Sequence, residues 1–292
     1  MKWLRRRRLP ESAEEPKADP GARRLTREGV HDVAGERLSR DGAMQLVALL
    51  SPSLELVHAS GTSVVGRLGG SAMLDEGQAW PMWEARPLTV VAVLDLARLP
   101  QVPDLPIPRE GWLTFFYDVE EQGAWGFDPK QSQAWRVVHA TTQARSVEGE
   151  NSLPVVELSA QESVTLPDFF EDSLDGLRDA EEEALAACYE VLGDAGIVHR
   201  IGGWPDLVQN PLWLEAQLAS NGIYVGGPEG YRDPRRPALE AGASDRRLLL
   251  QIDSDDAAEM MWGDVGRLYY VMTKDDMEAG RFDKAWFVLQ CC

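Results

Sequence analysis

The sequence predicts an α+β fold that is internally duplicated, with two related antiparallel β-rich halves and inserted helices. Four short blocks recur in the same order, and three of them are rich in β-branched and aromatic residues, which favour strands. RLGG at 67–70 returns as RIGG at 200–203, VVAVLD at 90–95 as LLLQID at 248–253, GWLTFFY at 111–117 as GRLYYVM at 266–272, and AWRVV at 134–138 as AWFVL at 285–289. Since strands joined by short connections usually pair, each half is expected to be an antiparallel meander that follows its glycine pair.

The segment before the first half divides into an arm and a short helix. Residues 1–30 hold nine Lys and Arg against five Asp and Glu, are rich in Pro, and show no apolar period, so they predict a disordered arm. A helix is expected over 41–50, with Asp41 as its cap and Pro52 just beyond it. LELVHA at 54–59 alternates as a strand does.

Two further helices are expected around the second half. The apolar spacing of 174–192 predicts the longest helix, which Ser173 or Asp172 would cap and Gly193 would end. Asn210-Pro211 predicts a helix that ends at 221–222. It lies in an insertion at 206–247 that also holds the loop-like GGPEGYRDPRRP. The predicted units are therefore the arm at 1–30, a first β-rich half at 40–160, and a helix with the second half at 161–292.

The overall charge and composition exclude several classes of partner. A formal charge of −19 would repel a phosphate backbone or an anionic lipid surface, so nucleic acid and membrane are not expected partners. No apolar run reaches the roughly 18 residues of a transmembrane helix. The 3 Cys form neither a C-x-x-C motif nor a disulfide framework, which favours a reduced, cytoplasmic setting. No motif indicates a cofactor.

The acidic stretch QIDSDDAAEMMWGD at 251–264 allows two interpretations. A Mg²⁺ or Ca²⁺ site could use Asp253, Asp255 and Asp264, although the stretch lacks the glycine and glutamate of an EF-hand. A solvated turn between strands is favoured, because acidic residues are common in turns. The repeat divides the stretch, since Asp253 matches Asp95 at the end of a strand, whereas Asp264 has no counterpart. Trp262 and Asp264 are therefore its better candidates for a binding site.

The glycine pairs match neither phosphate-binding glycine motif. Arg67 and Arg200, at matching places beside them, could bind an anion or could pair with Asp95 and Asp253 in their own halves. The internal pairing is favoured. Trp204 follows the second glycine pair, and tryptophans near such loops also line clefts.

These blocks resemble the YwqG-like family, a bacterial domain of unknown function. The resemblance covers about 40–292 and rests on GRLGGSAMLDEGQAWP (66–81), LDLARLP (94–100), GWLTFFYD (111–118), HRIGGWPDLVQ (199–209), LLLQIDSDDAAEMMWGDVGRLYYVM (248–272) and FDKAWFVLQC (282–291). It implies an α+β fold with an internal duplication, and it implies no activity, cofactor or catalytic residue.

The function predicted from these observations is binding. The partner would be a protein or a small molecule held in a cleft between the halves, where duplicated folds often place their sites. The candidate ligand-binding residues are Arg67, Arg200, Trp204, Trp262 and Asp264. The alternative is a metal-assisted hydrolase that uses the carboxylates of the 253–264 stretch.

Overall fold

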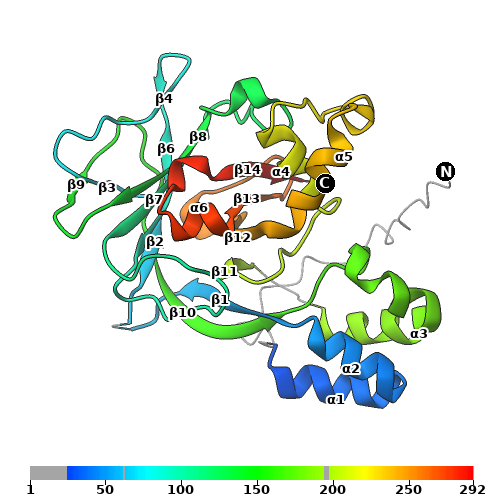
Figure 1. The fold of residues 1–292 in the computed structure, drawn as a ribbon. Helices are drawn as coiled ribbons and strands as arrows, with labels where there is room; N and C mark the ends of the chain where they lie inside the picture. Colours follow the sequence, from blue (N-terminus) through cyan, green and yellow to red (C-terminus); the bar gives the residue numbers. More distant parts are fainter. Residues whose placement is uncertain (1–24, 62, 194–196, 292) are drawn as a thin grey trace.

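Ten strands form one antiparallel sheet in the order β14-β13-β12-β11-β1-β10-β2-β6-β7-β8 (Figure 1). The computed structural model describes residues 25–61, 63–193 and 197–291. The first five strands in chain order are β1 (Ser51–His58), β2 (Gly66–Leu68), β6 (Thr89–Asp95), β7 (Trp112–Tyr117) and β8 (Trp135–Ala140). The other five are β10 (Val156–Thr165), β11 (His199–Gly202), β12 (Arg246–Asp253), β13 (Arg267–Thr273) and β14 (Trp286–Gln290). Two small antiparallel pairs lie outside it, β3 (Ala72–Leu74) with β9 (Arg145–Val147) and the hairpin of β4 (Met82–Trp83) with β5 (Arg86–Pro87).

The sheet curls until its two ends meet, so that one face encloses the main apolar core. The Phe115 and Tyr270 rings, on β7 and β13, lie 5.1 Å apart. The indole N–H of Trp135 on β8 donates to the carbonyl of Ala285, next to β14, at 3.1 Å. The predicted combination of helices with antiparallel strands is therefore confirmed, and the antiparallel sheet is nearly closed.

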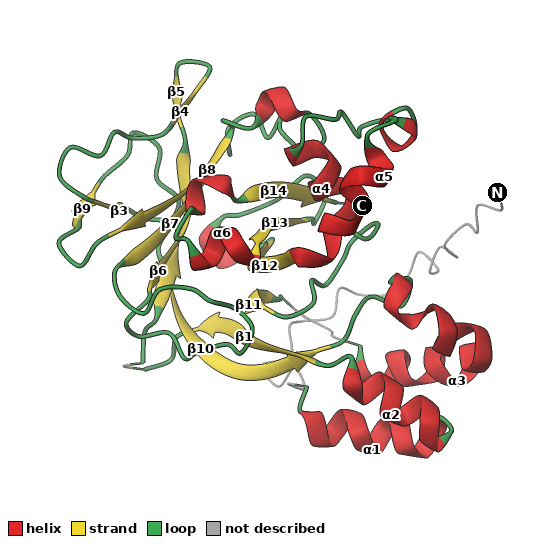
Figure 2. Cartoon of the chain, in the orientation of Figure 1, coloured by secondary structure: helices red, strands yellow, loops and turns green. Residues whose placement is uncertain are grey.

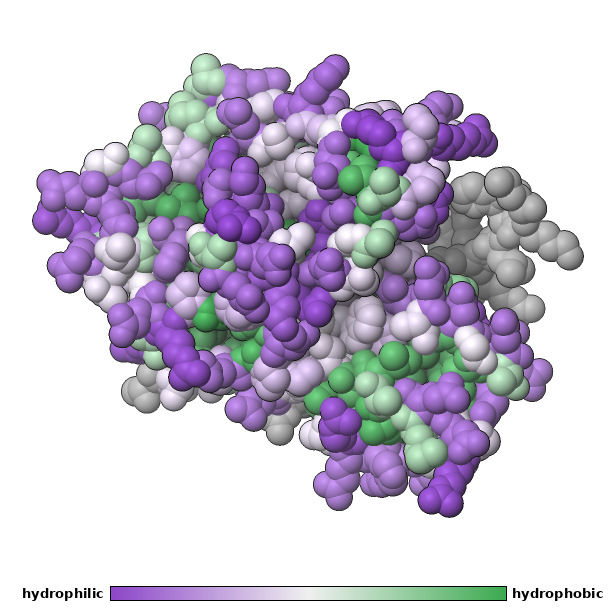
Figure 3. All heavy atoms as spheres, in the orientation of Figure 1, coloured by the Kyte–Doolittle hydropathy of each residue, from purple (hydrophilic) through white to green (hydrophobic). Residues whose placement is uncertain are grey.

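Three helices form a unit beside the sheet, with an apolar cluster of their own (Figure 2). They are α1 (Arg27–Arg37), α2 (Arg40–Ala48) and α3 (Asp175–Leu192). Of the remaining helices, α4 (Trp213–Ser220) packs against β14 and α6 (Lys274–Glu278) against β13, while α5 (Arg236–Leu239) packs beside α4 (Figure 1). Figure 3 shows apolar side chains gathered at the surface of the three-helix unit, where Met44 and Phe170 are 55% and 62% exposed.

The predicted strands are confirmed, whereas the helix ends differ from the prediction. Helix α1 was missed, and its first turn, 27–30, was placed in the disordered arm; residues 1–24 of that arm lie outside the described residues. The cap of α2 is Ser39, whose side chain accepts the N–H of Gly42, and Asp41 lies within the first turn. A 3-10 turn leads into α3 with no side-chain cap. Helix α4 begins at Trp213, two residues later than Pro211.

A kink in α3 joins this helix to α2. Glu181 has non-helical backbone angles (φ −142°, ψ 41°) inside α3. Its carboxylate accepts the Ser39 N–H at 2.7 Å and the Ser39 hydroxyl at 2.5 Å. Glu181 thereby braces the start of α2.

The ten strands of the sheet fall into two sets of five that are arranged alike in chain order. The first strand of each set pairs with the second strand of the other set. In chain order they run β1-β2-β6-β7-β8 and β10-β11-β12-β13-β14, yet β1 pairs with β11 and β10 pairs with β2. The registers of β6 and β12 shift at matching places, between Val90 and Ala92 and between Leu248 and Leu250. Both glycine pairs have positive φ, at 62° and 73° in the first set and 68° and 73° in the second. The predicted duplication agrees with this plan and stays a prediction.

Candidate ligand-binding site

The structure does not bring the five predicted ligand-binding residues into one site. Arg67 lies on β2 and donates to the carbonyl of Ser71. Arg200 lies on β11 and donates to the carbonyl of Trp204 at 3.1 Å. Both arginines therefore support the turn that follows their glycine pair.

The favoured pairs, Arg67 with Asp95 and Arg200 with Asp253, are not the ion pairs that these aspartates make. Asp95 lies 3.4 Å from Arg98, and Asp253 lies 3.0 Å from Arg267. Both aspartates do accept backbone N–H groups, from Ala97 in one case and from Val198 and Ser254 in the other. Both carboxylates therefore help to hold the turns at the ends of their strands.

The tryptophan and aspartate at the end of the acidic stretch also lie apart. Trp262 is fully buried, and its indole N–H donates to the carbonyl of Asp253 at 3.1 Å. Asp264 is exposed. Trp262 thus belongs to the core, where its ring lies 6.1 Å from that of Tyr117.

A buried carboxylate in the acidic stretch holds three chain segments together. Asp255 Oδ2 lies 2.6 Å from Nε2 of His58 on β1 and 3.1 Å from Nε2 of His199 on β11. Its Oδ1 accepts the N–H groups of Ala257 at 2.8 Å and Ala258 at 3.2 Å. Burial alone would raise the pKa of Asp255, but the bonds from the two histidines outweigh burial and hold it well below the usual range. The interpretation of this stretch as a solvated turn is therefore wrong for Asp255.

This cluster has metal-ligating residue types, but its hydrogen bonds do not suit a metal. Within the described ranges, one group of side chains, His58, His199 and Asp255, has the spacing of a metal site, and it includes neither Asp253 nor Asp264. Nδ1 of His199 accepts the N–H of Asp253 at 3.1 Å, so the ring proton is on Nε2, which donates to Asp255. A metal would need that same nitrogen without its proton. The cluster is better suited to fastening β1, β11 and the turn after β12.

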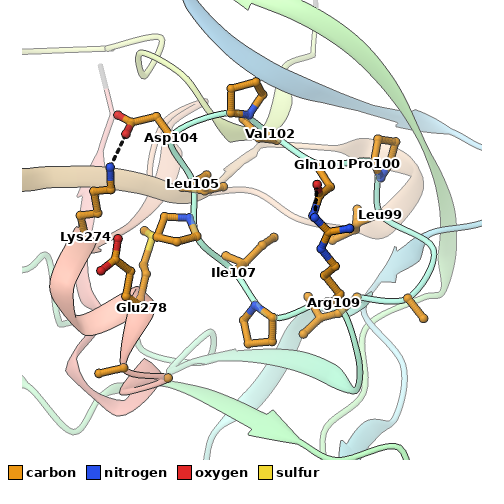
Figure 4. Close-up of a pocket in the computed structure, with 18 residues that line it drawn as sticks. Leu99, Pro100, Gln101, Val102, Asp104, Leu105, Ile107, Arg109, Lys274 and Glu278 are labelled. Carbon is orange, nitrogen blue, oxygen red and sulfur yellow. Dashed lines mark hydrogen bonds and ion pairs between the residues drawn. The ribbon is translucent and has the colours of Figure 1, made fainter.

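One hollow lies beside the loop that follows β6 and the helix that follows β13 (Figure 4). It has a volume of about 1030 Å³ and lies between the proline-rich loop 96–109 and α6. Three of its charged side chains already have partners within it. Asp104 binds Lys274 at 2.6 Å, and Arg109 donates to Gln101. Few of its polar groups would therefore gain a partner from a ligand.

A second pocket, which we call the helix–sheet pocket, lies between the three-helix unit and the insertion of the second half. Its volume is about 610 Å³, within the range of small-molecule sites. It is lined by Ala48, Leu49, Leu50, Ser51, Asp104, Glu171, Asp172, Gly203, Trp204, Pro211, Trp213, Leu214, Glu240, Ala243, Ser244, Arg246 and Arg247. The Trp204 and Trp213 rings meet edge to face, with centroids 6.3 Å apart. The indole N–H of Trp204 is used by the Leu49 carbonyl at 2.8 Å.

Two polar groups that line this pocket have unmet hydrogen bonds. Oε1 of Glu171 and the indole N–H of Trp213 are buried, and neither has a hydrogen-bond partner among the residues that the structure describes. Burial, assisted by Asp168 and Asp172, raises the pKa of Glu171 to about 7. The nearby Trp213 indole opposes this rise but does not reach hydrogen-bonding geometry. Since buried polar groups are nearly always paired, these two mark the wall of the pocket where a polar group would gain hydrogen bonds.

Sequence reasoning identified Trp204 of this pocket and missed Glu171 and Trp213. Glu171 lies in an acidic turn before α3, which gives no sign of burial, and Trp213 begins α4. A usable signal was that the insertion at 206–247 occurs in only one of the two halves.

A comparison with protein families places this chain. The model of a domain of unknown function, DUF1963, matches residues 66–291. The chain belongs to the DUF1963 family. The matched region holds most of the helix–sheet pocket, while the wall at 48–51 precedes it. A comparison with curated proteins gave no match.

The family description assigns no activity to the DUF1963 domain.

Across residues 25–61, 63–193 and 197–291, none of the helices has the length and apolar composition of a transmembrane span.

Proposed function

We propose that this DUF1963 protein is a binding protein that holds a small ligand in the helix–sheet pocket. The observation that carries the proposal is the pair of unmet polar groups, Glu171 Oε1 and Trp213 Nε1, at one wall of a pocket with two indole rings. An aromatic or aliphatic body would contact the indoles, while a donor group of the ligand would meet Glu171 and a separate acceptor group would meet Trp213. The sequence left open a protein or a small molecule, and the pocket volume of about 610 Å³ favours the small molecule.

The insertion found in one half supports this location. If the chain arose by duplication, the parts that differ between its halves are where a function of its own would develop. The position that matches Trp204 in the first half is Ser71, and α4 has no counterpart there. We also propose that the chain arose by internal duplication, that it is a bacterial and cytoplasmic protein, and that it is similar to the YwqG-like family.

The test is a small-molecule screen by thermal shift on three proteins. We expect compounds that raise the melting temperature of the wild type, and we expect Trp213→Phe to lose most of that rise because it removes the free N–H. Trp125→Phe is the matched control, since Trp125 is a half-buried indole outside the helix–sheet pocket whose N–H is bonded to the Gln122 carbonyl. A screen without stabilising compounds, or a rise that survives in Trp213→Phe, would contradict the proposal.

A further inference from the structure

The charges around Glu171 are unbalanced. Asp168 and Asp172 on its own segment both raise its pKa, and no basic side chain lowers it. Of the two arginines that line the pocket, Arg247 is bound to Asp104 at 3.0 Å. The other, Arg246, donates to Gln217 at 3.0 Å and to Ser220, on α4. The described part of the chain thus supplies Glu171 with no cation.

The other acids that line the pocket are either paired or exposed: Glu240 and Asp104 have cationic partners, and Asp172 is exposed. Glu240 accepts from Arg236 at 2.8 Å, and Asp104 accepts from Lys274 at 2.6 Å as well as from Arg247. Glu171 therefore differs from Glu240 and Asp104 by the lack of a positive charge beside it, and from Asp172 by its burial. A buried carboxylate without a counter-charge is unfavourable, so a ligand that brings one would be bound preferentially.

We propose that the ligand of the helix–sheet pocket carries a protonated amine, which the Glu171 carboxylate binds while the two indoles contact its apolar body. This inference rests on the proposed function. An ammonium group supplies N–H donors to Glu171, and the faces of Trp204 and Trp213 attract a cation. An anionic ligand would face Glu171 and Asp172, and a neutral one would leave the carboxylate without its charge partner.

Amine binding is coupled to the release of a proton. Because the pKa of Glu171 is raised to about 7, roughly half of its carboxyls are protonated at pH 7, and a bound cation expels that proton. Affinity therefore rises from pH 6 to pH 8. The other titratable or charged groups around Glu171 and its pocket are Asp104, Asp168, Asp172, Tyr189, Glu240, Arg246 and Arg247.

The experiment compares three probes with the same ring and chain, 2-phenylethylamine, 2-phenylethanol and phenylacetate. Binding to the full chain is followed at the indole N–H resonance of Trp213, identified by its loss in Trp213→Phe, and by calorimetry in two buffers of different ionisation enthalpy. We expect the amine to bind at least about tenfold more tightly than the alcohol, and phenylacetate to bind weakest. About half a proton should be released per amine at pH 7.

Two variants make the outcome specific. Glu171→Gln should remove both the preference for the amine and the proton release, while the alcohol still binds. Glu240→Gln, which changes an acid of the same pocket that already has a partner, should keep both. If the alcohol or phenylacetate binds as tightly as the amine, the amine inference fails and the proposed site stands. If no probe moves the Trp213 resonance and the thermal screen is also negative, the proposed function fails with it.

Discussion

Replacing Asp255 by asparagine tests whether the buried carboxylate fastens β1, β11 and the turn after β12. Asparagine keeps Oδ1 for the N–H groups of Ala257 and Ala258, but it places an NH₂ group against the Nε2–H of His199. His199 cannot move its proton to Nδ1, because Nδ1 accepts the N–H of Asp253. One charge-assisted bond is lost and a buried donor is left without a partner, so Asp255→Asn should reduce the free energy of unfolding by about 2–5 kcal/mol.

The half-exposed histidine of the cluster contributes little to this loss of stability. The His58 side chain is 46% exposed, so water can replace its bond to Asp255.

The stabilisation by Asp255 depends on pH. The folded-state pKa of Asp255 lies below that of the unfolded chain, so the stabilisation is complete above about pH 4 and is lost as pH falls further. The difference between wild type and Asp255→Asn should therefore shrink from pH 7 to pH 3.

Equilibrium unfolding in urea at the two pH values measures both effects. Asp256→Asn is the matched control, since this neighbouring carboxylate is exposed, and we expect it to change stability by less than about 0.5 kcal/mol. Two results would refute this reasoning. One is an equal loss of unfolding free energy in Asp255→Asn and Asp256→Asn at pH 7, and the other is a difference between wild type and Asp255→Asn that is the same at pH 7 and pH 3.

Three further predictions concern stability. The folded-state pKa of Glu171 is raised from 4.5 to about 7. Between pH 4 and pH 8 the free energy of unfolding of the wild type should therefore fall by on the order of 3 kcal/mol relative to that of Glu171→Gln, as measured by urea unfolding across that range. In Gly69→Ala the new Cβ would lie 2.3 Å from the Pro154 carbonyl oxygen at φ +62°, so thermal unfolding should show a loss at least about 2 kcal/mol larger than in Gly77→Ala, where φ is +80° and no atom lies within 4 Å. Ser39→Ala removes the cap of α2 and one bond to Glu181, so it should lower the free energy of unfolding in urea by about 1–2 kcal/mol. For each of the three, an unfolding midpoint that does not change as stated would contradict the argument.

The strands could be predicted because each is decided by its own residues. In 112–117 and 267–273, β-branched and aromatic side chains follow one another, and both faces are buried, so local preference and burial agree. Helix α1 was missed because its one buried stripe is narrow: Val30 and Ala34 are its buried residues, and the remainder resembles the charged arm before it. A helix of this kind is stabilised by packing against α2 and α3 more than by its composition.

The candidate sites could not be predicted because they depend on contacts between distant segments. Asp255 meets His58 and His199, which are 197 and 56 positions away in the chain. Glu171 is surrounded in sequence by acidic and turn-forming residues, so a solvated position was the natural expectation. It is buried in the folded chain, where Trp213, 42 positions away, lies near it. Burial of this kind cannot be deduced from neighbours in sequence.

The crossing of β1 and β10 between the two sets of strands affects how this chain is made. Strand β1 ends at His58, yet one of its partners, β11, is complete only at Gly202. At ~5–20 residues per second, roughly 7–30 s pass in synthesis before both edges of β1 can pair. During that interval the nascent chain exposes strand edges that could join other chains, so its yield should be sensitive to chaperones and to translation speed.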